Sequence, residues 1–255
     1  MIEFVIHHDK RVYALVNYEE VIEYLELPFY KKWLRDFPSW KKLAEASQIE
    51  VLMHWKGLGY NSRALRLHKL AKLVTTEYSG RLPQSREVLE KLPGIGPYTS
   101  GAICAFAYQQ PASLIETNIR RVYLHHFFKG KENVNDQEIL KKIQRSLPPL
   151  AREVSGGRRG IRDWYYALMD YGSYLAKTIP NPNRKSKHYA KQLKFEGSDR
   201  QIRGKILGIL LEKGKINSPT LMRVVGEDMV RVTRVIRRLE SEGFLKTTAH
   251  SIWLI

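Results

Sequence analysis

Apolar residues recur three and four positions apart over most of the chain, from residue 18 to about residue 195. Because this spacing places apolar side chains on one face of a helix, it predicts an all-α region. Three stretches carry the repeat most clearly: Val21–Leu25, Leu65–Leu73 and Ile139–Leu147. Strand-like alternation occurs only near the ends, in residues 3–6 with 12–15 and from Phe244 to Ile255. The pattern therefore predicts a mainly α protein without an extended sheet.

The composition changes between Ile179 and Lys205. Pro180 and Pro182 block helix continuation. Residues 184–205 then carry eight Lys or Arg against two acidic residues. We therefore expect three parts, namely an α domain over residues 1–180, a basic linker over 181–200 and a second domain over 201–255.

The last part of the chain predicts three helices followed by a two-stranded hairpin. The expected bounds are 201–212, 219–225 and 228–242 for the helices and 245–255 for the hairpin. This order is typical of a winged helix. On the third helix, one face is apolar, and another carries Arg231, Arg234 and Arg238. That basic face could enter a DNA groove; the alternatives are a solvated face or a surface that docks a protein.

The charge points to a polyanionic partner. The chain has 255 residues, 43% of them apolar, and 43 Lys and Arg against 26 Asp and Glu give a formal charge of +17. No apolar run reaches the roughly 18 residues that span a bilayer, and the first residues do not resemble a signal peptide. One cysteine, Cys104, excludes an internal disulfide and a cluster held by several cysteines. We expect a cytoplasmic, nucleoid-associated protein with no membrane partner.

Residues 91–103 predict a helix-hairpin-helix motif. A helix ends at Leu92, Gly94-Ile95-Gly96 allows a tight turn, and Pro97 is suited to the first turn of a new helix. Backbone amides at such a turn bind phosphate without reading bases. Lys91 lies beside the turn. The glycine pair alone would indicate only a turn between two helices.

Several ordered motifs resemble the helix-hairpin-helix DNA glycosylase superfamily, most closely its branch of adenine DNA glycosylases and endonuclease III. The resemblance covers roughly residues 30 to 176. Its matching segments are residues 55–60, 63–64, 67–68, 92–103, 106–107, 111, 115–122 and 167–172. It implies an enzyme that cuts a flipped base from its sugar.

In that family the catalytic carboxylate is an Asp at the start of a helix, and Glu116 occupies the position here. A fixed anion stabilises the positive charge that develops on the sugar, and it orients or deprotonates the attacking water. Glu is one methylene longer than Asp, and a displacement of about 1 Å can cost on the order of a hundredfold in rate. The alternative is a carboxylate that only interacts with the backbone at the start of a helix.

Relatives with lyase activity carry a Lys where this chain has Tyr98. A lysine amine can form a Schiff base with the sugar and a phenol cannot, so the resemblance implies a monofunctional glycosylase. The alternative for Tyr98 is a packing role. Close relatives also hold an iron–sulfur cluster with four cysteines, but here the stretch from Lys177 to Asn183 has none. We expect no cofactor and no iron–sulfur cluster; the family suggests a monovalent cation at the hairpin.

Further candidate DNA-binding residues follow from the same resemblance. Tyr60 follows a glycine turn that the family places near DNA, although it could simply pack two helices. Asn118 belongs to the motif around Glu116. One of Arg120 and Arg121 is expected to meet phosphate, and the other to form an ion pair or lie on the surface. The acid that protonates the leaving base is only loosely matched, at Glu19 or Glu20.

The combined prediction is a monomeric glycosylase that acts on double-stranded DNA containing a mispaired or damaged base. Adenine opposite guanine or 8-oxoguanine is the first substrate to consider. Thymine or uracil opposite guanine is the alternative, because the N-terminal acid motif is weak and the usual 8-oxoguanine-checking domain is not evident. A noncatalytic protein that binds mismatched or damaged DNA is the rival from another class.

Overall fold

The computed structural model describes residues 3–6, 12–15, 27–148, 160–191 and 194–255, with side chains from residue 29 onward. The chain divides into two compact units, and each is discontinuous in sequence. The first unit contains residues 1–39 and 74–190, and the second contains residues 40–73 and 191–255. In the described residues, no helix combines the length and the apolar character that a membrane crossing requires.

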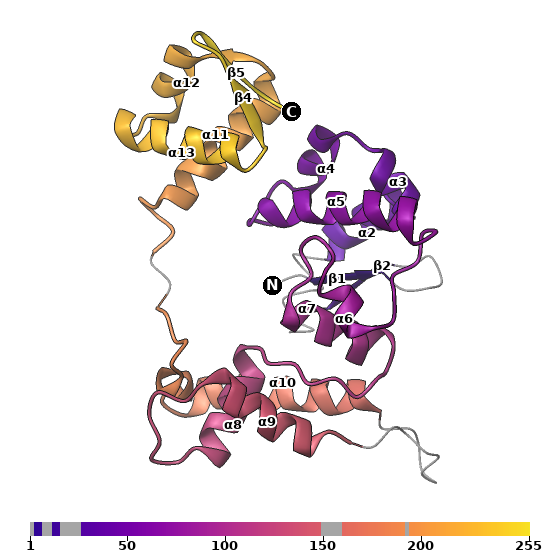
Figure 1. The fold of residues 1–255 in the computed structure, drawn as a ribbon. Coiled ribbons are helices and arrows are strands. Elements are labelled where there is room, and N and C mark those ends of the chain that lie inside the picture. The colour runs from indigo at the N-terminus through magenta and orange to yellow at the C-terminus, as the bar shows by residue number, and fades with distance from the viewer. Residues whose placement is uncertain (1–2, 7–11, 16–26, 149–159, 192–193) are drawn as a thin grey trace. The chain divides into compact units, whose positions relative to one another are not determined.

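The first unit is mainly helical, as the periodicity predicts (Figure 1). Its two strands pair antiparallel, with Glu3 opposite Leu15, which confirms the short strands expected near the N-terminus. Its elements, in chain order, are β1 (Glu3–Ile6), β2 (Val12–Leu15), α2 (Leu27–Asp36), α6 (Arg86–Leu89), α7 (Pro97–Ala102), the π-helix η2 (Ile103–Ala107), α8 (Thr117–Phe127), α9 (Asp136–Ser146), α10 (Ile161–Thr178) and the 3-10 helix η3 (Pro182–Lys185).

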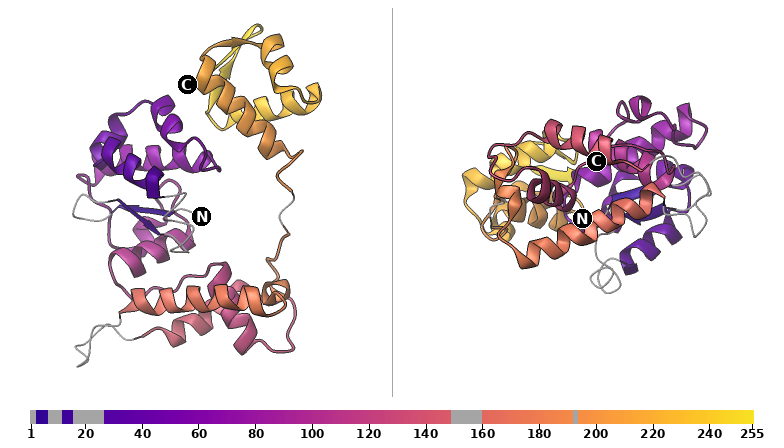
Figure 2. Two further views of the ribbon diagram at one scale, coloured as in Figure 1. Left: turned by 180° about the vertical axis from the view of Figure 1, so that it is seen from behind. Right: turned by 90° about the horizontal axis from the view of Figure 1, so that it is seen from below.

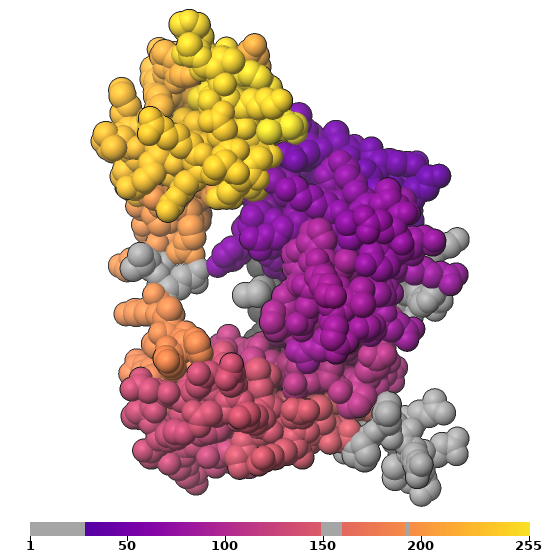
Figure 3. All heavy atoms as spheres, viewed as in Figure 1, coloured from indigo at the N-terminus to yellow at the C-terminus, as the bar shows by residue number. Residues whose placement is uncertain are grey.

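The core of this unit lies between α8, α9 and α10, which lie side by side in both views of Figure 2. Apolar side chains of all three helices are buried together with residues of α7 and η2, and the atoms of this region form one continuous mass in Figure 3. Tyr165 of α10 is fully buried, and its hydroxyl donates to the carbonyl of Ala112 (2.7 Å) and accepts from the amide of Leu114 (3.1 Å). These bonds fix the segment that leads into α8.

A glycine sets the distance between α8 and α10. A Cβ at Gly172 would lie 2.3 Å from the carbonyl oxygen of Asn118, a separation that no side chain tolerates. The two backbones therefore meet at this point because residue 172 has no side chain. The close crossing brings α10 against the first turn of α8, where Asn118 lies.

The segment after α10 is more ordered than a linker needs to be. The helix ends at Thr178, as the prolines predict, but Asn183 and Ser186 are buried. Asn183 donates through Nδ2 to the carbonyl of Thr117 (3.1 Å), and the backbone of Val134 bonds with both Lys185 and Lys187 (2.9 Å each). Residues 182–187, within the linker predicted over 181–200, thus pack against α8 and the segment before α9.

The second unit contains two groups of helices separated in sequence (Figure 1). Its elements are α3 (Trp40–Glu45), α4 (Gln48–Trp55), α5 (Ser62–Glu77, which continues into the first unit), α11 (Asp199–Lys213), β3 (Ile216–Asn217), α12 (Ser218–Val225), α13 (Met229–Ser241), β4 (Leu245–Thr247) and β5 (Ser251–Leu254). The three predicted C-terminal helices and the hairpin are confirmed to within a few residues. The two-residue strand β3 was missed.

The C-terminal helices pack on a small antiparallel sheet with strand order β3-β5-β4. Ile216 pairs with Ile252, and Leu245 pairs with Leu254. The predicted apolar face of α13 is confirmed, since its four members are buried: Val232, Val235, Ile236 and Leu239. Local signals fix the helix ends, because Asp228 caps α13 and Gly214 ends α11 with a φ of 67°.

Candidate active site and DNA-contact surfaces

The turn between α6 and α7 has the geometry of a helix-hairpin-helix. The amide of Ile95 donates to the carbonyl of Leu92 (3.1 Å), and Ile95 is buried, which anchors the turn to the protein. Gly94 has a φ of 79°, a conformation that favours glycine. Gly96 is the N-cap of α7, and Pro97 occupies its first turn, as the sequence predicts. A Cβ at Gly96 would meet nothing within 4 Å, so this backbone is open to an approaching phosphate.

A half-buried arginine joins this hairpin to the segment before Glu116. Arg86 donates to the carbonyls of Ser113 (2.8 Å) and Pro97 (3.0 Å) and to the carboxylate of Glu90 (2.9 Å). Ser100 donates to the same Glu90 oxygen (2.7 Å). The role of Arg86 was not predictable from the sequence, because no local pattern indicates partners 11 and 27 residues away.

Close backbone packing supports the same junction. A Cβ at Gly101 would lie 2.9 Å from the carbonyl oxygen of Ser113 and 3.0 Å from Cβ of Leu114. The glycine of α7 therefore lets the helix approach the segment that precedes Glu116. Tyr98, in the first turn of α7, is partly buried and packs against the core between α8 and α10. Tyr98 thus has the packing contacts that the alternative interpretation of this residue predicts.

Glu116 is the N-cap of α8. Its backbone is extended, with a φ of −126°, and its Oε1 accepts a hydrogen bond from the amide of Ile119 (2.6 Å). Burial raises the pKa of the Glu116 carboxyl, while backbone hydrogen bonds from Asn118 and Ile119 and the charges of Arg121 and Arg120 act in the opposite direction. The predicted place at the start of a helix is confirmed. This geometry holds the carboxylate in one orientation and is compatible with both interpretations of the residue.

The two arginines after Glu116 make contacts inside the protein. Arg120 forms a bidentate ion pair with Asp136 (2.9 and 2.7 Å). Arg121 is buried and donates to the side chain of Asn118 and to the carbonyl of Gly172 (2.6 Å). One of the two was expected in an ion pair, and Arg120 is. Arg121 instead links α8 to α10, and Asn118 is oriented by it.

Tyr60 lies in a tight turn between α4 and α5. Gly57 and Gly59 have positive φ values of 97° and 73°, and Tyr60 itself has a φ of 46°, an uncommon conformation for a residue with a side chain. The indole of Trp55, at the end of α4, donates to the carbonyl of Gly59 (2.8 Å), and this bond holds the turn against the helix. Tyr60 is 58% exposed. A strained turn that presents an exposed aromatic ring is the kind of feature found at binding sites.

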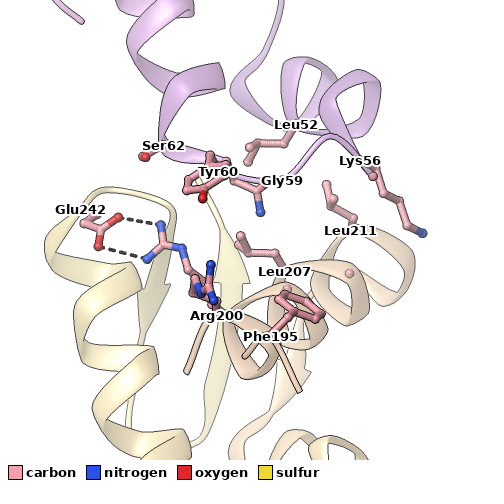
Figure 4. A pocket seen from close by; sticks show the side chains of 15 residues that line it. Leu52, Lys56, Gly59, Tyr60, Ser62, Phe195, Arg200, Leu207, Leu211 and Glu242 are labelled. Atoms are coloured by element: carbon pink, nitrogen blue, oxygen red, sulfur yellow. Dashed lines mark hydrogen bonds and ion pairs between the residues drawn. The ribbon is translucent and has the colours of Figure 1, made fainter. Parts of the chain in front are cut away.

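A pocket adjoins this turn within the second unit (Figure 4). Leu52 of α4 and Leu207 and Leu211 of α11 give it an apolar floor, and Phe195 and Arg200 lie at its edge. Arg203, bonded to Glu242 (2.6 Å), forms a further part of the lining. This pocket was not predictable from the sequence, because its walls come from segments more than 130 residues apart.

The arginines predicted on α13 differ in their surroundings. Arg231 and Arg234 both contact Asp199 (2.9 and 3.1 Å), and Arg231 also donates to the carbonyl of Gly197 (2.8 Å). Arg238 is exposed. Arg237, which the sequence analysis did not single out, lies beside it on the outer surface of the helix and lines the same shallow groove. The prediction of one uniform basic face thus changes to a paired part and an exposed part.

Among the described residues, no group of three or more His, Cys, Asp or Glu side chains could hold a metal ion. Cys104 is buried in η2, and burial raises the pKa of its thiol, as expected for a small core residue. His126 bonds with the hydroxyl of Tyr171 (2.9 Å). Glu19 and Glu20, considered as the base-protonating acid, fall outside the described residues. The absence of a cofactor and the monovalent cation at the hairpin stay predictions.

Comparison with known proteins gives consistent matches. Residues 16–149 match the model of a family described as HhH-GPD superfamily base excision DNA repair protein. The adenine DNA glycosylase of Mycolicibacterium smegmatis is 29% identical over 87% of this chain and 78% of its own length. That of Buchnera aphidicola subsp. Baizongia pistaciae is 32% identical over 62% of this chain and 43% of its own length. A solved thermostable thymine-DNA glycosylase is 28% identical, with a TM-score of 0.51 over 63% of this chain and 69% of its own.

Proposed function

Because the chain belongs to the HhH-GPD superfamily of base excision DNA repair proteins, we propose that it is a DNA N-glycosylase that hydrolyses the bond between a base and its sugar in double-stranded DNA. The observation that carries this proposal is Glu116, a partly buried carboxylate at the start of α8. It is joined to the helix-hairpin-helix through Ser113 and Arg86. One structural unit thereby contains both a phosphate-binding turn and a fixed anion.

In the proposed reaction, the target base leaves the stack and its sugar comes to lie against Glu116. The ionised carboxylate stabilises the positive charge that grows on the sugar as the bond to the base breaks. It also takes a proton from, or orients, the water that attacks the sugar. The hydrogen bond from the Ile119 amide keeps the carboxylate in place, so little reorganisation is needed during the reaction.

We expect a monofunctional enzyme. Tyr98 stands at the position of the lysine in lyase-proficient relatives, and a phenol does not form a Schiff base with the opened sugar. The product is therefore an abasic site in an intact strand. No step requires an iron–sulfur cluster or another cofactor, and a monovalent cation at the hairpin would assist only phosphate binding.

The names of the relatives favour adenine as the excised base, and we propose guanine or 8-oxoguanine as the base opposite it. Both curated relatives described above are adenine DNA glycosylases, and one of them is matched over most of this chain. The solved thymine-DNA glycosylase supports the second candidate, thymine or uracil opposite guanine. Thymine and uracil leave as anions with less help from an acid, which suits the weak match at Glu19 and Glu20.

We propose DNA contacts at the hairpin and at the turn after α4. Lys91 and the backbone of residues 94–96 would bind phosphate, and Tyr60 would contact the duplex. Asn118 would act at the entrance to α8, where Arg121 orients it. The hydrogen bonds of Arg120 and Arg121 go to protein partners. The two arginines would therefore attract the DNA backbone through their charge and not through direct hydrogen bonds to phosphate. The proposed enzyme is a monomer of the cytoplasm that works on nucleoid DNA.

The order α11, β3, α12, α13, β4 and β5 supports the assignment of residues 201–255 as a winged helix. Residues 1–180 would then form the glycosylase domain. Because residues 182–187 pack against α8 and the segment before α9, we assign them to the glycosylase domain as well.

The test is a single-turnover assay of the wild type and of Glu116→Gln on four duplexes, containing A:G, A:8-oxoguanine, T:G and U:G pairs. Abasic sites are measured as strand breaks with and without alkali. We expect base release by the wild type from at least one duplex, with breaks only after alkali, and a fall of at least about a hundredfold in Glu116→Gln because the anion is lost.

A control variant and two further outcomes distinguish a monofunctional glycosylase from a lyase and from a noncatalytic DNA-binding protein. Glu138→Gln removes an exposed carboxylate from α9 and should leave the rate unchanged. Breaks without alkali, or covalent trapping on abasic DNA by borohydride, would show lyase activity and refute the monofunctional assignment. Tight binding to a mismatch with no base release from any of the four duplexes would favour the noncatalytic DNA-binding protein instead.

A further inference from the structure

The outer face of α13 is formed by two parallel rows of residues, none of which is buried. Four positions apart along the helix, Met229, Thr233, Arg237 and Ser241 form one row, and Val230, Arg234 and Arg238 form the other. These seven residues line a shallow groove along the helix. Met229 and Val230 are 69% and 74% exposed, although both are apolar. The opposite face of α13 is buried in the core of the C-terminal helices.

Four acidic side chains of this part of the chain have partners in the protein, and one of them, Asp199, pairs with Arg234 of the groove. Asp199 pairs with Arg231 and Arg234, Glu227 pairs with Lys205, and Glu242 pairs with Arg203. Glu240 of α13 accepts hydrogen bonds from the amide (2.9 Å) and hydroxyl (2.7 Å) of Thr247. Within the described part of the chain, Arg237 and Arg238 form no ion pair.

The resulting surface carries positive charge that the protein itself does not neutralise. Residues 199–255 contain eleven Lys and Arg against six Asp and Glu. Since four of these acids accept from other cations or from Thr247, Arg237 and Arg238 keep their positive charge at the surface. Adjacent exposed cations on one helix suit a polyanion with closely and regularly spaced charges, and duplex DNA has that property.

The shape of the surface agrees with the charge. A helix of 13 residues is about 20 Å long, and the major groove, about 12 Å wide, admits a helix. The exposed Met229 and Val230 lie at the N-terminal end, the part of a recognition helix that reaches base edges, where thymine methyl groups offer apolar contacts. The hydrogen bonds from Thr247 to Glu240 hold the β4–β5 hairpin beside the helix, with Lys246 exposed on it.

We propose that this outer face of α13 is a second DNA-binding surface, which binds undamaged duplex DNA independently of the site around Glu116. Arg237 and Arg238 provide its phosphate contacts. Arg231 is not a direct contact, since it holds α13 to Asp199 and Gly197. The surface would keep the enzyme on DNA while the helix-hairpin-helix unit finds its substrate, so its loss should weaken binding and spare the chemical step.

The test compares the full-length wild type, R237Q/R238Q and the control K141Q/K142Q. The control removes the same charge from two exposed lysines of α9. Binding to an undamaged duplex is measured by fluorescence anisotropy over a range of salt concentrations. For R237Q/R238Q we expect a loss of roughly tenfold in affinity and a decrease of about 2 in the slope of log affinity against log salt, because two phosphate contacts are lost.

A second measurement separates this proposal from the proposed activity. Base release at saturating enzyme should be equal in R237Q/R238Q and the wild type, and both should unfold at the same temperature, since the two side chains are exposed. If R237Q/R238Q and K141Q/K142Q bind undamaged duplex equally well, with equal salt slopes, the α13 face does not bind DNA and the proposal is refuted. Binding to undamaged duplex is readable whether or not any base is released, so failure of the glycosylase assignment would not obscure it.

Discussion

The acidity of Glu116 is governed by effects of opposite sign. Burial favours the neutral carboxyl, whereas the amides of Asn118 and Ile119 and the charges of Arg121 and Arg120 favour the carboxylate, and burial is the larger effect. The pKa of the Glu116 carboxyl is thus higher than that of an exposed glutamate. A group of this kind leaves a trace in the pH dependence of the reaction.

We predict that base release depends on a group with a raised pKa. The reaction requires ionised Glu116, so the rate falls as the pH drops through the pKa of this carboxyl, and burial moves that fall to a pH above the ordinary value of about 4.3. Single-turnover rates at saturating enzyme should decline about tenfold per pH unit on the acid side. In Glu116→Gln this limb should disappear. A wild-type rate that stays constant down to about pH 4 would contradict the prediction.

Single residues also show what a sequence can and cannot specify. The position of Glu116 at the start of a helix was implied by the resemblance to the glycosylase family, and the structure places it as the N-cap of α8. The partners of the basic residues could not be predicted. Arg120 pairs with Asp136, and Arg231 and Arg234 pair with Asp199, which lies more than 30 positions away from them in the sequence. Whether an arginine is available to DNA depends on such distant acids, and periodicity does not reveal them.

Arg86 connects three elements. It belongs to α6, and it bonds to Pro97 at the start of α7 and to Ser113 in the segment that leads to Glu116. Hydrogen bonds from a charged donor are among the stronger ones in proteins. Arg86 is therefore a positioning residue, which acts on catalysis through the relative placement of the hairpin and the carboxylate.

We predict that Arg86→Ala lowers the free energy of unfolding by about 2 kcal/mol, because the carbonyl of Ser113 and the carboxylate of Glu90 lose the charged donor. It should also slow base release at saturating enzyme, with little effect on the pH at which the rate falls. Arg145→Ala, which removes an exposed charge from α9, serves as the control. Denaturant titration and single-turnover rates measure the two effects. Equal stability and rate in the two variants would show that Arg86 does not position the site.

The boundaries of helices were predictable where the chain carries local signals. Pro97 begins α7, Asp228 caps α13 and Gly214 ends α11, each as the residue type suggests. The strand β3 was missed because two residues carry no alternation. The turn of residues 182–185 was missed for another reason, since Pro182 and Asn183 look like linker residues until Asn183 is seen to bond with the first turn of α8.

At the scale of the whole molecule, sequence order and spatial grouping differ. Residues 40–73 cluster with residues 191–255, although the sequence pattern assigns them to the same domain as Glu116. Helical periodicity correctly predicts a helix over Leu65–Leu73, which lies in α5, but does not say which segment covers its apolar face. In the second unit, Gln48 of α4 donates to the carbonyl of Gly243 (2.8 Å), a contact between residues 195 positions apart.

The chain is also expected to fold without a metal cluster, and this can be measured. An iron–sulfur cluster takes four cysteine ligands, and the sequence has only Cys104, which is buried in η2. The segment after α10 is fixed instead by protein contacts, from Asn183 to Thr117 and from Val134 to residues 185 and 187. We predict that the purified protein has no visible absorption band and that EDTA changes neither its unfolding temperature nor its rate of base release. Asn183→Ala should lower the unfolding temperature equally with and without EDTA. A coloured protein, or one that a chelator destabilises, would mean that a metal contributes to the fold.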